Sequence, residues 1–263
     1  MEDHQIILYP KSRRATFDVG YFGGRKHDVL GLIEIDVTEA REKLQASKEV
    51  GQRIGFTAWL IKQIADTVAE HPEVHALAIG NERLVAFDEV DVSLAIEREV
   101  EGVKVPLAAI IRKANQKSTR EIDQEIQTYR TGLLDDPAQR VLTERRHRFS
   151  TGLFFSLPGW MRRLVWRWLL RSPFSIKRNM GTLIVTNPGM FSSAPGWVIP
   201  KTLHNLAIGV GPVCKKPWVI HDQVEVRQIL HLTLMFNHNV IDGAPAARFT
   251  NRLVERLESA QGL

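Results

Sequence analysis

An apolar, β-prone run that ends in a polar turn is the feature that most constrains how this chain can fold. Residues 232–236 (LTLMF) predict a buried strand, residues 237–243 (NHNVIDG) a turn, and residues 244–259 an amphipathic helix. A strand that passes through a short polar turn into a helix is typical of α/β proteins. The polar side chains of the turn are then expected at one edge of a sheet.

The rest of the chain continues this alternation of strands and helices. Thr38 is positioned to cap a helix over residues 39–46, and Ser118 or Thr119 to cap one over residues 119–134. A further helix is expected at residues 54–70, before Pro72. Strands are expected at residues 29–37, 83–87, 90–96, 103–110, 181–186, 205–210, 218–226 and 229–236. The pattern predicts one α/β domain over residues 1–263, with a large sheet covered by helices.

Composition excludes several classes of protein. The 263 residues are 44% hydrophobic and 25% charged, which argues against disorder. A single cysteine cannot build an intrachain disulfide framework. The sequence shows neither a secretory signal nor an apolar run long enough for a membrane-spanning helix. We therefore expect a cytoplasmic protein, and peripheral attachment to a membrane is left open.

His238 is the strongest candidate for chemistry, because it follows the buried strand directly. Asp242 lies four residues later and Gly243 turns the chain into the final helix. An imidazole that titrates near neutral pH can take a proton from a thiol or a hydroxyl group, and an aspartate can orient it. The pattern alone is equally compatible with a structural histidine that caps a turn.

Two segments resemble the catalytic domain of the dihydrolipoamide acyltransferases. Residues 236–253 (FNHNVIDGAPAARFTNRL) are similar to the active-site signature of that family, and residues 180–191 (MGTLIVTNPGMF) to its strand ending in Ser/Thr-Asn-x-Gly. Residues 17–38 (FDVGYFGGRKHDVLGLIEIDVT) look more like chloramphenicol acetyltransferase. The resemblance implies the two-layer sandwich of that superfamily, in which helices cover a large mixed β-sheet.

The resemblance also implies roles for individual residues. His238 would be the catalytic base, Asp242 and Gly243 would complete its motif, and Thr186, followed by Asn187, would stabilise the oxyanion. By analogy with chloramphenicol acetyltransferase, Arg25 would form a structural ion pair with Asp242. The family implies a homotrimer, or a larger assembly of trimers, in which His238 of one subunit faces Thr186 of its neighbour.

The resemblance leaves the donor open. The acyl group would pass directly from a thioester to a thiol, hydroxyl or amine, without an acyl-enzyme. The preferred donor is acyl-CoA; a lipoyl or pantetheine carrier protein acting in trans is the alternative. Coenzyme A would be a substrate, and neither a bound prosthetic group nor a metal is expected. No lipoyl or subunit-binding domain is recognised in residues 1–263, so a carrier would have to be supplied in trans. The intact His238, Asp242 and Gly243 argue against a non-catalytic trimeric scaffold or a membrane-recruited binding module, but a long basic insertion, described next, keeps that interpretation open.

A strongly basic segment at about residues 135–178 departs from the family. Residues 140–178 hold ten Lys or Arg and one acid, a net charge of +9, whereas the rest of the chain carries −4. Family members have a short connection at this position. The segment is therefore expected to be an insertion in the catalytic domain.

Within this insertion, residues 157–171 predict a basic helix rich in tryptophan. Three interpretations remain open: a helix at a membrane surface, a lid over an acyl tunnel, and a helix packed on the body with solvated arginines. No recognised nucleic-acid motif accompanies the charge, so nucleic acid is not an expected partner. The candidate contact residues are Trp160, Arg163, Trp166, Arg167, Trp168 and Arg171.

Overall fold

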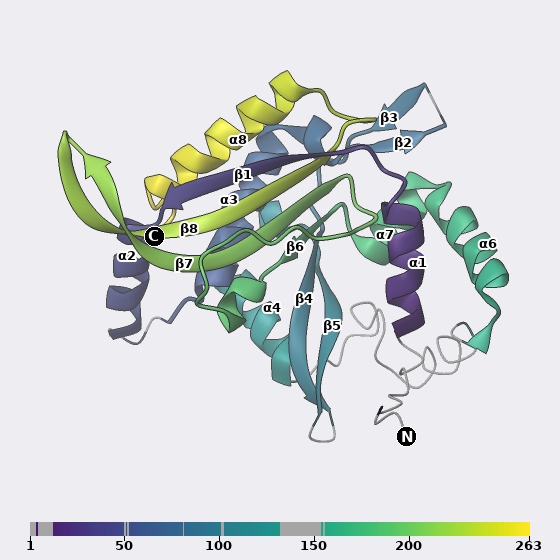
Figure 1. The fold of residues 1–263 in the computed structure, drawn as a ribbon, viewed down its shortest axis with the longest axis horizontal. Coiled ribbons are helices and arrows are strands. Elements are labelled where there is room, and N and C mark those ends of the chain that lie inside the picture. The colour runs from purple at the N-terminus through teal and green to yellow at the C-terminus, as the bar shows by residue number, and fades with distance from the viewer. Residues whose placement is uncertain are drawn as a thin grey trace.

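The computed structural model describes residues 4, 13–49, 51, 53–80, 82–100, 103–131, 154 and 156–263. Residues 135–153 of the predicted insertion lie outside the described residues. The described chain forms a mixed sheet with helices packed on one face and a cluster of helices at one end (Figure 1). The expected α/β fold, with a large mixed sheet covered by helices, is confirmed.

The strands are β1 (Asp28–Asp36), β2 (Leu77–Ile79), β3 (Arg83–Val85), β4 (Val92–Val100), β5 (Val103–Ile111), β6 (Leu183–Thr186), β7 (Leu206–Ile220) and β8 (Gln223–Asn237). The α-helices are α1 (Arg13–Gly23), α2 (Thr38–Glu49), α3 (Phe56–Glu70), α4 (Thr119–Thr131), α6 (Gly159–Leu170), α7 (Pro173–Met180) and α8 (Gly243–Glu258). The sequence did not predict α1, α7 or β2, and the other predicted elements fall within a few residues of these bounds, apart from the β7–β8 region.

The six-stranded sheet has the order β1-β8-β7-β6-β4-β5. Strands β4, β6 and β7 run parallel to one another, whereas β1, β8 and β7 form an antiparallel set. Strand β1 pairs with β8 along its whole length, so that Asp28 lies opposite Asn237. This pairing brings the beginning of β1 beside the turn that contains His238.

The prediction for strands β7 and β8 was wrong in one respect. Residues 218–226 were expected to form one strand, but they are the tip of a long hairpin in which Ile220 pairs with Gln223. His221 and Asp222 form its two-residue turn, and both have left-handed φ values, of 49° and 63°. A tight two-residue hairpin turn needs positive φ at both central positions, and His and Asp are among the non-glycine residues that adopt it most readily.

Two predicted caps had different outcomes. The Ser118 hydroxyl accepts from the Glu121 backbone N–H, and the Glu121 carboxylate accepts from the Ser118 N–H, so Ser118 caps α4 in a capping box. Thr38 does not cap α2. Its hydroxyl accepts from the Gln228 backbone N–H at 2.7 Å and donates to Asp36, which ties the end of β1 to β8.

The hydrophobic core lies between the sheet and helices α3, α4 and α8. Trp59 of α3 is fully buried, and its indole N–H donates to the carbonyl of Gln261 at 2.9 Å. Phe249 of α8 packs edge-on against Phe236 of β8. These contacts fix α8, and with it the turn that precedes it, against the sheet.

The cluster at the end of the sheet consists of α1, α6 and α7 (Figure 1). Arg162 of α6 is buried against Asp18 of α1, with Nε–Oδ2 and Nη2–Oδ1 distances of 2.8 and 3.1 Å. Lys177 of α7 binds Glu89 at 2.7 Å. No helix among the described residues has both the length and the apolar character needed to cross a bilayer.

Candidate functional site

The turn that carries His238 is fixed by backbone hydrogen bonds. The His238 N–H donates to the carbonyl of His27 at 2.7 Å, just before β1. The Asn237 carbonyl accepts from the N–H groups of Val240 and Ile241 at 2.9 and 3.2 Å. The backbone position of His238 is therefore set by the end of β8, by His27 just before β1 and by the turn over residues 237–241.

The His238 imidazole remains accessible. Its side chain is 50% exposed, and Nδ1 lies 3.9 Å from Oδ1 of Asp242, whose side chain is 89% exposed. This distance is too long for a hydrogen bond. Gly243 begins α8 directly afterwards. The ring is thus free to exchange a proton with a bound group.

Asparagine side chains brace the turn on both sides. The Asn237 amide donates to the side-chain oxygen of Asn205 at 2.9 Å, and the Asn205 amide donates to the carbonyl of Ala76 at 2.8 Å. The Asn239 side-chain oxygen lies 2.8 Å from Nδ1 of His27. The sequence analysis did not assign these residues a role. Their signal was the occurrence of asparagines immediately before β7 and around the end of β8.

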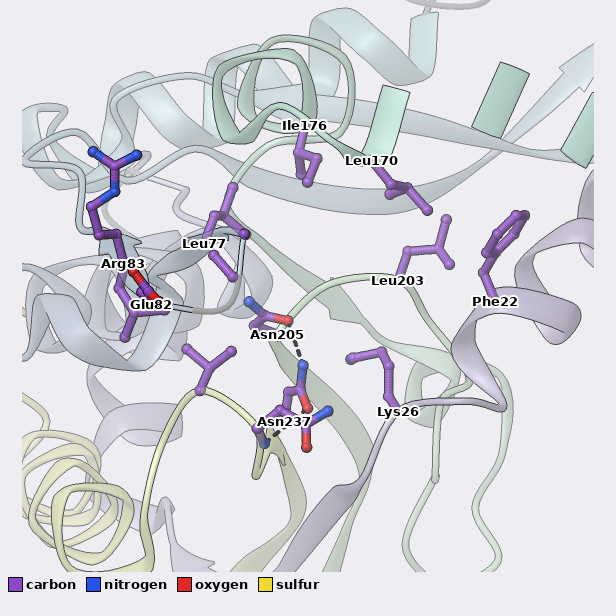
Figure 2. A pocket seen from close by; sticks show the side chains of 15 residues that line it. Phe22, Lys26, Leu77, Glu82, Arg83, Leu170, Ile176, Leu203, Asn205 and Asn237 are labelled. Atoms are coloured by element: carbon purple, nitrogen blue, oxygen red, sulfur yellow. Dashed lines mark hydrogen bonds between the residues drawn. The ribbon is translucent and has the colours of Figure 1, made fainter. Parts of the chain in front are cut away.

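A cavity of about 720 Å³ opens beside this turn (Figure 2). Asn237 and Asn239, the residues on either side of His238, contribute to its wall, and Lys26 and Asn205 supply further polar groups. Leu170 and Ile176 line it from the basic insertion. The insertion therefore shapes the space next to the turn that carries the candidate base.

Lys26 is the most buried charged group in this wall. Burial lowers the pKa of its ammonium group, and the carboxylate of Asp28, 3.2 Å away, partly offsets this effect. The ammonium group also donates to the carbonyl of His204. Lys26 thus connects the beginning of β1 to the loop before β7.

Arg25 occupies a different place from the one predicted. Its guanidinium carbon lies 3.6 Å from the centroid of the Tyr21 ring, and the group donates to the Tyr21 carbonyl. Arg163 of α6 contacts the same ring at 4.9 Å. Within the described part of the chain no ion pair joins Arg25 to Asp242, so a cation–π contact to Tyr21 replaces the predicted pair. The aspartate of the FDV segment, Asp18, instead binds Arg162.

Thr186 ends β6 and is partly buried. Asn187 follows it and donates to the hydroxyl of Thr57 at 3.1 Å, beside a cavity of about 170 Å³. Gly189 lies next in the loop, so close to Gly211 that a Cβ there would be 2.1 Å from the Gly211 carbonyl. This close approach fixes the distance between the loop after β6 and the backbone of β7.

Thr186 and His238 of the same chain do not meet. Thr186 pairs with Gly209 of β7, and Gly209 pairs with Thr233 of β8, five residues before His238. Two strand spacings and five residues along a strand correspond to roughly 15–20 Å. A hydroxyl and an imidazole at this distance cannot act on the same carbonyl group.

The insertion candidates divide into two groups. Trp160, Arg167, Trp168 and Arg171 are exposed on α6 and at its end, whereas Arg163 and Trp166 are partly buried. The inner side of α6 carries the buried Arg162. In the described residues no cluster of three or more metal-ligating side chains occurs.

Comparison with known proteins gives a consistent family assignment. The family model "2-oxoacid dehydrogenases acyltransferase (catalytic domain)" matches residues 29–138 and 177–263, on either side of the basic segment. A dihydrolipoyllysine-residue succinyltransferase of Buchnera aphidicola is 23% identical over 80% of this chain and 44% of its own length. The lipoamide acyltransferase component of the Bacillus subtilis branched-chain complex is 24% identical over 87% of this chain and 46% of its own length.

Solved structures share the fold. A probable dihydrolipoamide acetyltransferase from Listeria monocytogenes has a TM-score of 0.70 with 20% identity, covering 98% of this chain and 96% of that one. The cubic core of a pyruvate dehydrogenase multienzyme complex has a TM-score of 0.69 with 19% identity, covering 98% and 93%. The chain spans less than half the length of the curated relatives that it matches first.

The family match covers most of the chain, including β6, with Thr186, and the His238 turn. The chain belongs to the family of the catalytic domain of 2-oxoacid dehydrogenase acyltransferases.

Proposed function

We propose that this chain is an acyltransferase that moves an acyl group between a coenzyme A thioester and an acceptor thiol, with His238 as general base. Residues 1–263 would form one catalytic domain with an insertion at about residues 135–178. The observation that carries the proposal is the accessible His238 imidazole on a rigid turn beside a cavity of about 720 Å³. Family membership makes acyl transfer the expected chemistry for this arrangement.

The reaction would proceed by direct transfer. His238 takes the proton of the acceptor thiol, and the thiolate attacks the thioester carbonyl. The new carbon–sulfur bond produces a tetrahedral oxyanion, which needs a hydrogen-bond donor while the negative charge is present. As the intermediate collapses, the carbon–sulfur bond to coenzyme A breaks and the coenzyme A sulfur receives the proton from the imidazolium. Asp242 would help to orient the ring.

The oxyanion donor would come from a second copy of the chain. Within one chain Thr186 is too far from His238, as the pairing of β6, β7 and β8 requires. We propose a homotrimer in which Thr186 of one subunit meets His238 of the next. Exposed apolar side chains on the edge strand β1, namely Val29, Leu30 and Leu32, support association with another copy.

A lipoyl group is a favoured acceptor class. The names of the bacterial relatives describe transfer involving a dihydrolipoyllysine residue. The reverse reaction, from an acylated lipoyl or pantetheine carrier to coenzyme A, would use the same groups. No bound prosthetic group is needed in either direction.

The test is thiol release from a panel of acyl-CoAs, with dihydrolipoamide, an alcohol and water as acceptors. His238→Ala is expected to reduce the rate by about 10²–10⁴-fold. His221→Asn is the matched control, because His221 lies at the far tip of the β7–β8 hairpin in a conformation that asparagine tolerates. Release that is equal in wild type and His238→Ala would refute the role of His238. No release from any donor, in either direction, would favour a non-catalytic scaffold.

A further inference from the structure

The outward side of α6 combines exposed apolar groups with arginines. We use the name α6 outer face for Trp160, Leu164, Val165, Arg167 and Trp168, together with Arg171 just after the helix. Trp160 is 60% exposed and Trp168 is 73% exposed, and Leu164 lies between them one turn from each. Large apolar side chains at this spacing form a continuous stripe, which is unusual on a surface that faces only water.

The charge around this stripe has one sign. Residues 159–180 contain six Lys or Arg and no acid. Two of these bases are neutralised by acids elsewhere, Arg162 by Asp18 and Lys177 by Glu89. Arg163, Arg167, Arg171 and Arg178 form no ion pair with any carboxylate that the structure describes. The face therefore complements an anionic surface.

The α6 outer face contains a shallow depression that is lined in part by two arginines. It has a volume of about 340 Å³ and is lined by Tyr21, Trp160, Arg163, Leu164 and Arg167. Two guanidinium groups beside aromatic rings suit a phosphate group, because guanidinium forks bind phosphate oxygens in pairs. An apolar floor beside them suits an attached hydrocarbon chain.

Contacts on the opposite side of α6 hold the helix against the rest of the fold. Arg162 binds Asp18 through two hydrogen bonds and donates a third to the Leu157 carbonyl at 2.9 Å. Leu170 at the end of α6 lines the cavity beside the His238 turn. The inner side of the helix thus packs against the rest of the fold. Helix α6 lies at one end of the molecule (Figure 1), and the side chains of the α6 outer face are exposed.

We propose that the α6 outer face binds the surface of a bilayer that contains anionic lipids, with α6 lying parallel to the membrane plane. The tryptophans would enter the boundary between headgroups and acyl chains, and the arginines would bind lipid phosphates. With its 12 residues, α6 is only about 18 Å long and cannot cross the hydrocarbon core. The exposed valines at the tip of the β7–β8 hairpin lack this combination, because Glu225 lies among them.

The test is flotation of the full chain with two kinds of vesicle, phosphatidylcholine alone and phosphatidylcholine mixed with phosphatidylglycerol. Wild type is expected to float with the anionic vesicles and to be released by salt. Arg167→Glu with Arg171→Glu should reduce the bound fraction by at least about tenfold, since each basic residue near an anionic surface contributes about fivefold in affinity. Trp160→Ser with Trp168→Ser should reduce it by a similar factor.

Two matched controls test the location. Arg53→Glu with Arg120→Glu makes the same change of charge at exposed sites on other elements, and Val224→Ser removes an apolar side chain that is 73% exposed at the hairpin tip. Both control variants should bind as wild type does. Equal loss in the charge control would show non-specific attraction and overturn the proposal.

Three further outcomes would overturn it. They are absence of flotation with anionic vesicles, flotation that both α6 variants retain, and a change in oligomeric state in those variants, which would assign the face to contacts between copies. Light scattering measures the last of these. Thiol release in the same variants separates this proposal from the catalytic one, because loss of lipid binding with intact, His238-dependent release leaves the catalytic proposal standing.

Discussion

Arg162 and Asp18 lie 144 positions apart in the sequence and form a two-point ion pair that is almost completely shielded from solvent. The pair joins the helix before β1 to the basic insertion. Arg162, to which the sequence analysis gave no role, is therefore a structural residue. Its three neighbours in the pattern, Arg163, Arg167 and Arg171, have no carboxylate partner among the described residues.

Arg162→Met is expected to destabilise the docking of α6 on α1 by about 3–5 kcal/mol, because it leaves the Asp18 carboxylate buried without a partner. Faster limited proteolysis of the insertion and a lower unfolding midpoint would report the loss. Asp18→Leu combined with Arg162→Met should recover part of the stability, since no uncompensated charge remains. Equal destabilisation in the single and double variants would contradict this account.

A catalytic site shared between subunits predicts complementation. Thr186→Val should lower the rate by about 10²–10³-fold, and His238→Ala by a comparable or larger factor. In mixed trimers made by co-expressing the two variants, about one quarter of the sites combine an intact histidine with an intact threonine. Thiol release at about that fraction of the wild-type rate is expected. A mixture no more active than the separate variants would refute the shared site.

Two buried histidines predict a loss of stability in mild acid. Burial lowers the pKa of His204 to about 4, and the same cause lowers the pKa of His75 to about 4. Because the unfolded chain binds these protons near the ordinary pKa of 6.5, stability is complete above pH 6.5 and falls toward pH 4, by up to about 3 kcal/mol for each histidine.

Urea unfolding at several pH values measures this slope. His204→Gln should make the slope between pH 6.5 and pH 4 shallower, because one of the two buried groups is then absent. The substitution also disturbs the hydrogen bonds of His204 to Thr202 and the Met180 carbonyl, so the slope is the informative quantity rather than the absolute stability. An unchanged slope would contradict the assignment of His204.

Gly189→Ala is expected to displace the loop after Thr186, because the new Cβ would lie 2.1 Å from the carbonyl of Gly211. Overpacking of this kind costs about 1–3 kcal/mol. This loop positions the end of β6, which carries Thr186, against β7. We therefore expect kcat to fall by more than the fraction of unfolded protein alone would explain. Gly20→Ala is the control, because nothing lies within 4 Å of a Cβ at that position. A normal kcat in Gly189→Ala would show that the position of this loop does not affect the reaction.

Leu170→Trp should reduce the space in the cavity beside His238, because Leu170 is part of its wall. We expect a higher KM for bulky acceptors, with a smaller effect on the smallest one. Leu164→Trp places the same side chain on the outer side of the helix and should leave KM unchanged. A KM profile unaffected by Leu170→Trp would show that the acceptor enters elsewhere.

Much of the fold could be predicted from periodicity. The strand over Asp28–Asp36, the helix over Phe56–Glu70 and the C-terminal helix carry clear patterns of apolar residues, and the structure contains all three. The β7–β8 hairpin was divided wrongly, because a two-residue turn of His221 and Asp222 lacks the glycine that usually marks such turns. Helix α1 was missed, and its role depends on Asp18 meeting a residue 144 positions away.

The position of His238 in the fold could be predicted from the sequence, but the contacts around it could not. The motif around His238 predicted a histidine at the end of a strand, and β8 ends at Asn237. The brace formed by Asn205, Asn237 and Asn239 was invisible, because its members come together only through the pairing of β7, β8 and β1. The sequence analysis predicted an ion pair of Arg25 with Asp242, whereas the structure shows a contact with the Tyr21 ring. Tertiary packing decides between these two contacts, and the sequence does not show it.

The strands β6, β7 and β8 separate Thr186 from His238 within one chain, so a reactive centre that needs both residues would make the rate depend on the protein concentration. If each reactive centre needs two copies, activity per milligram falls on dilution with a steep dependence on concentration. A newly synthesised copy then has half of two centres and the whole of none. Such a subunit would then not hydrolyse thioesters before it has assembled with its partners.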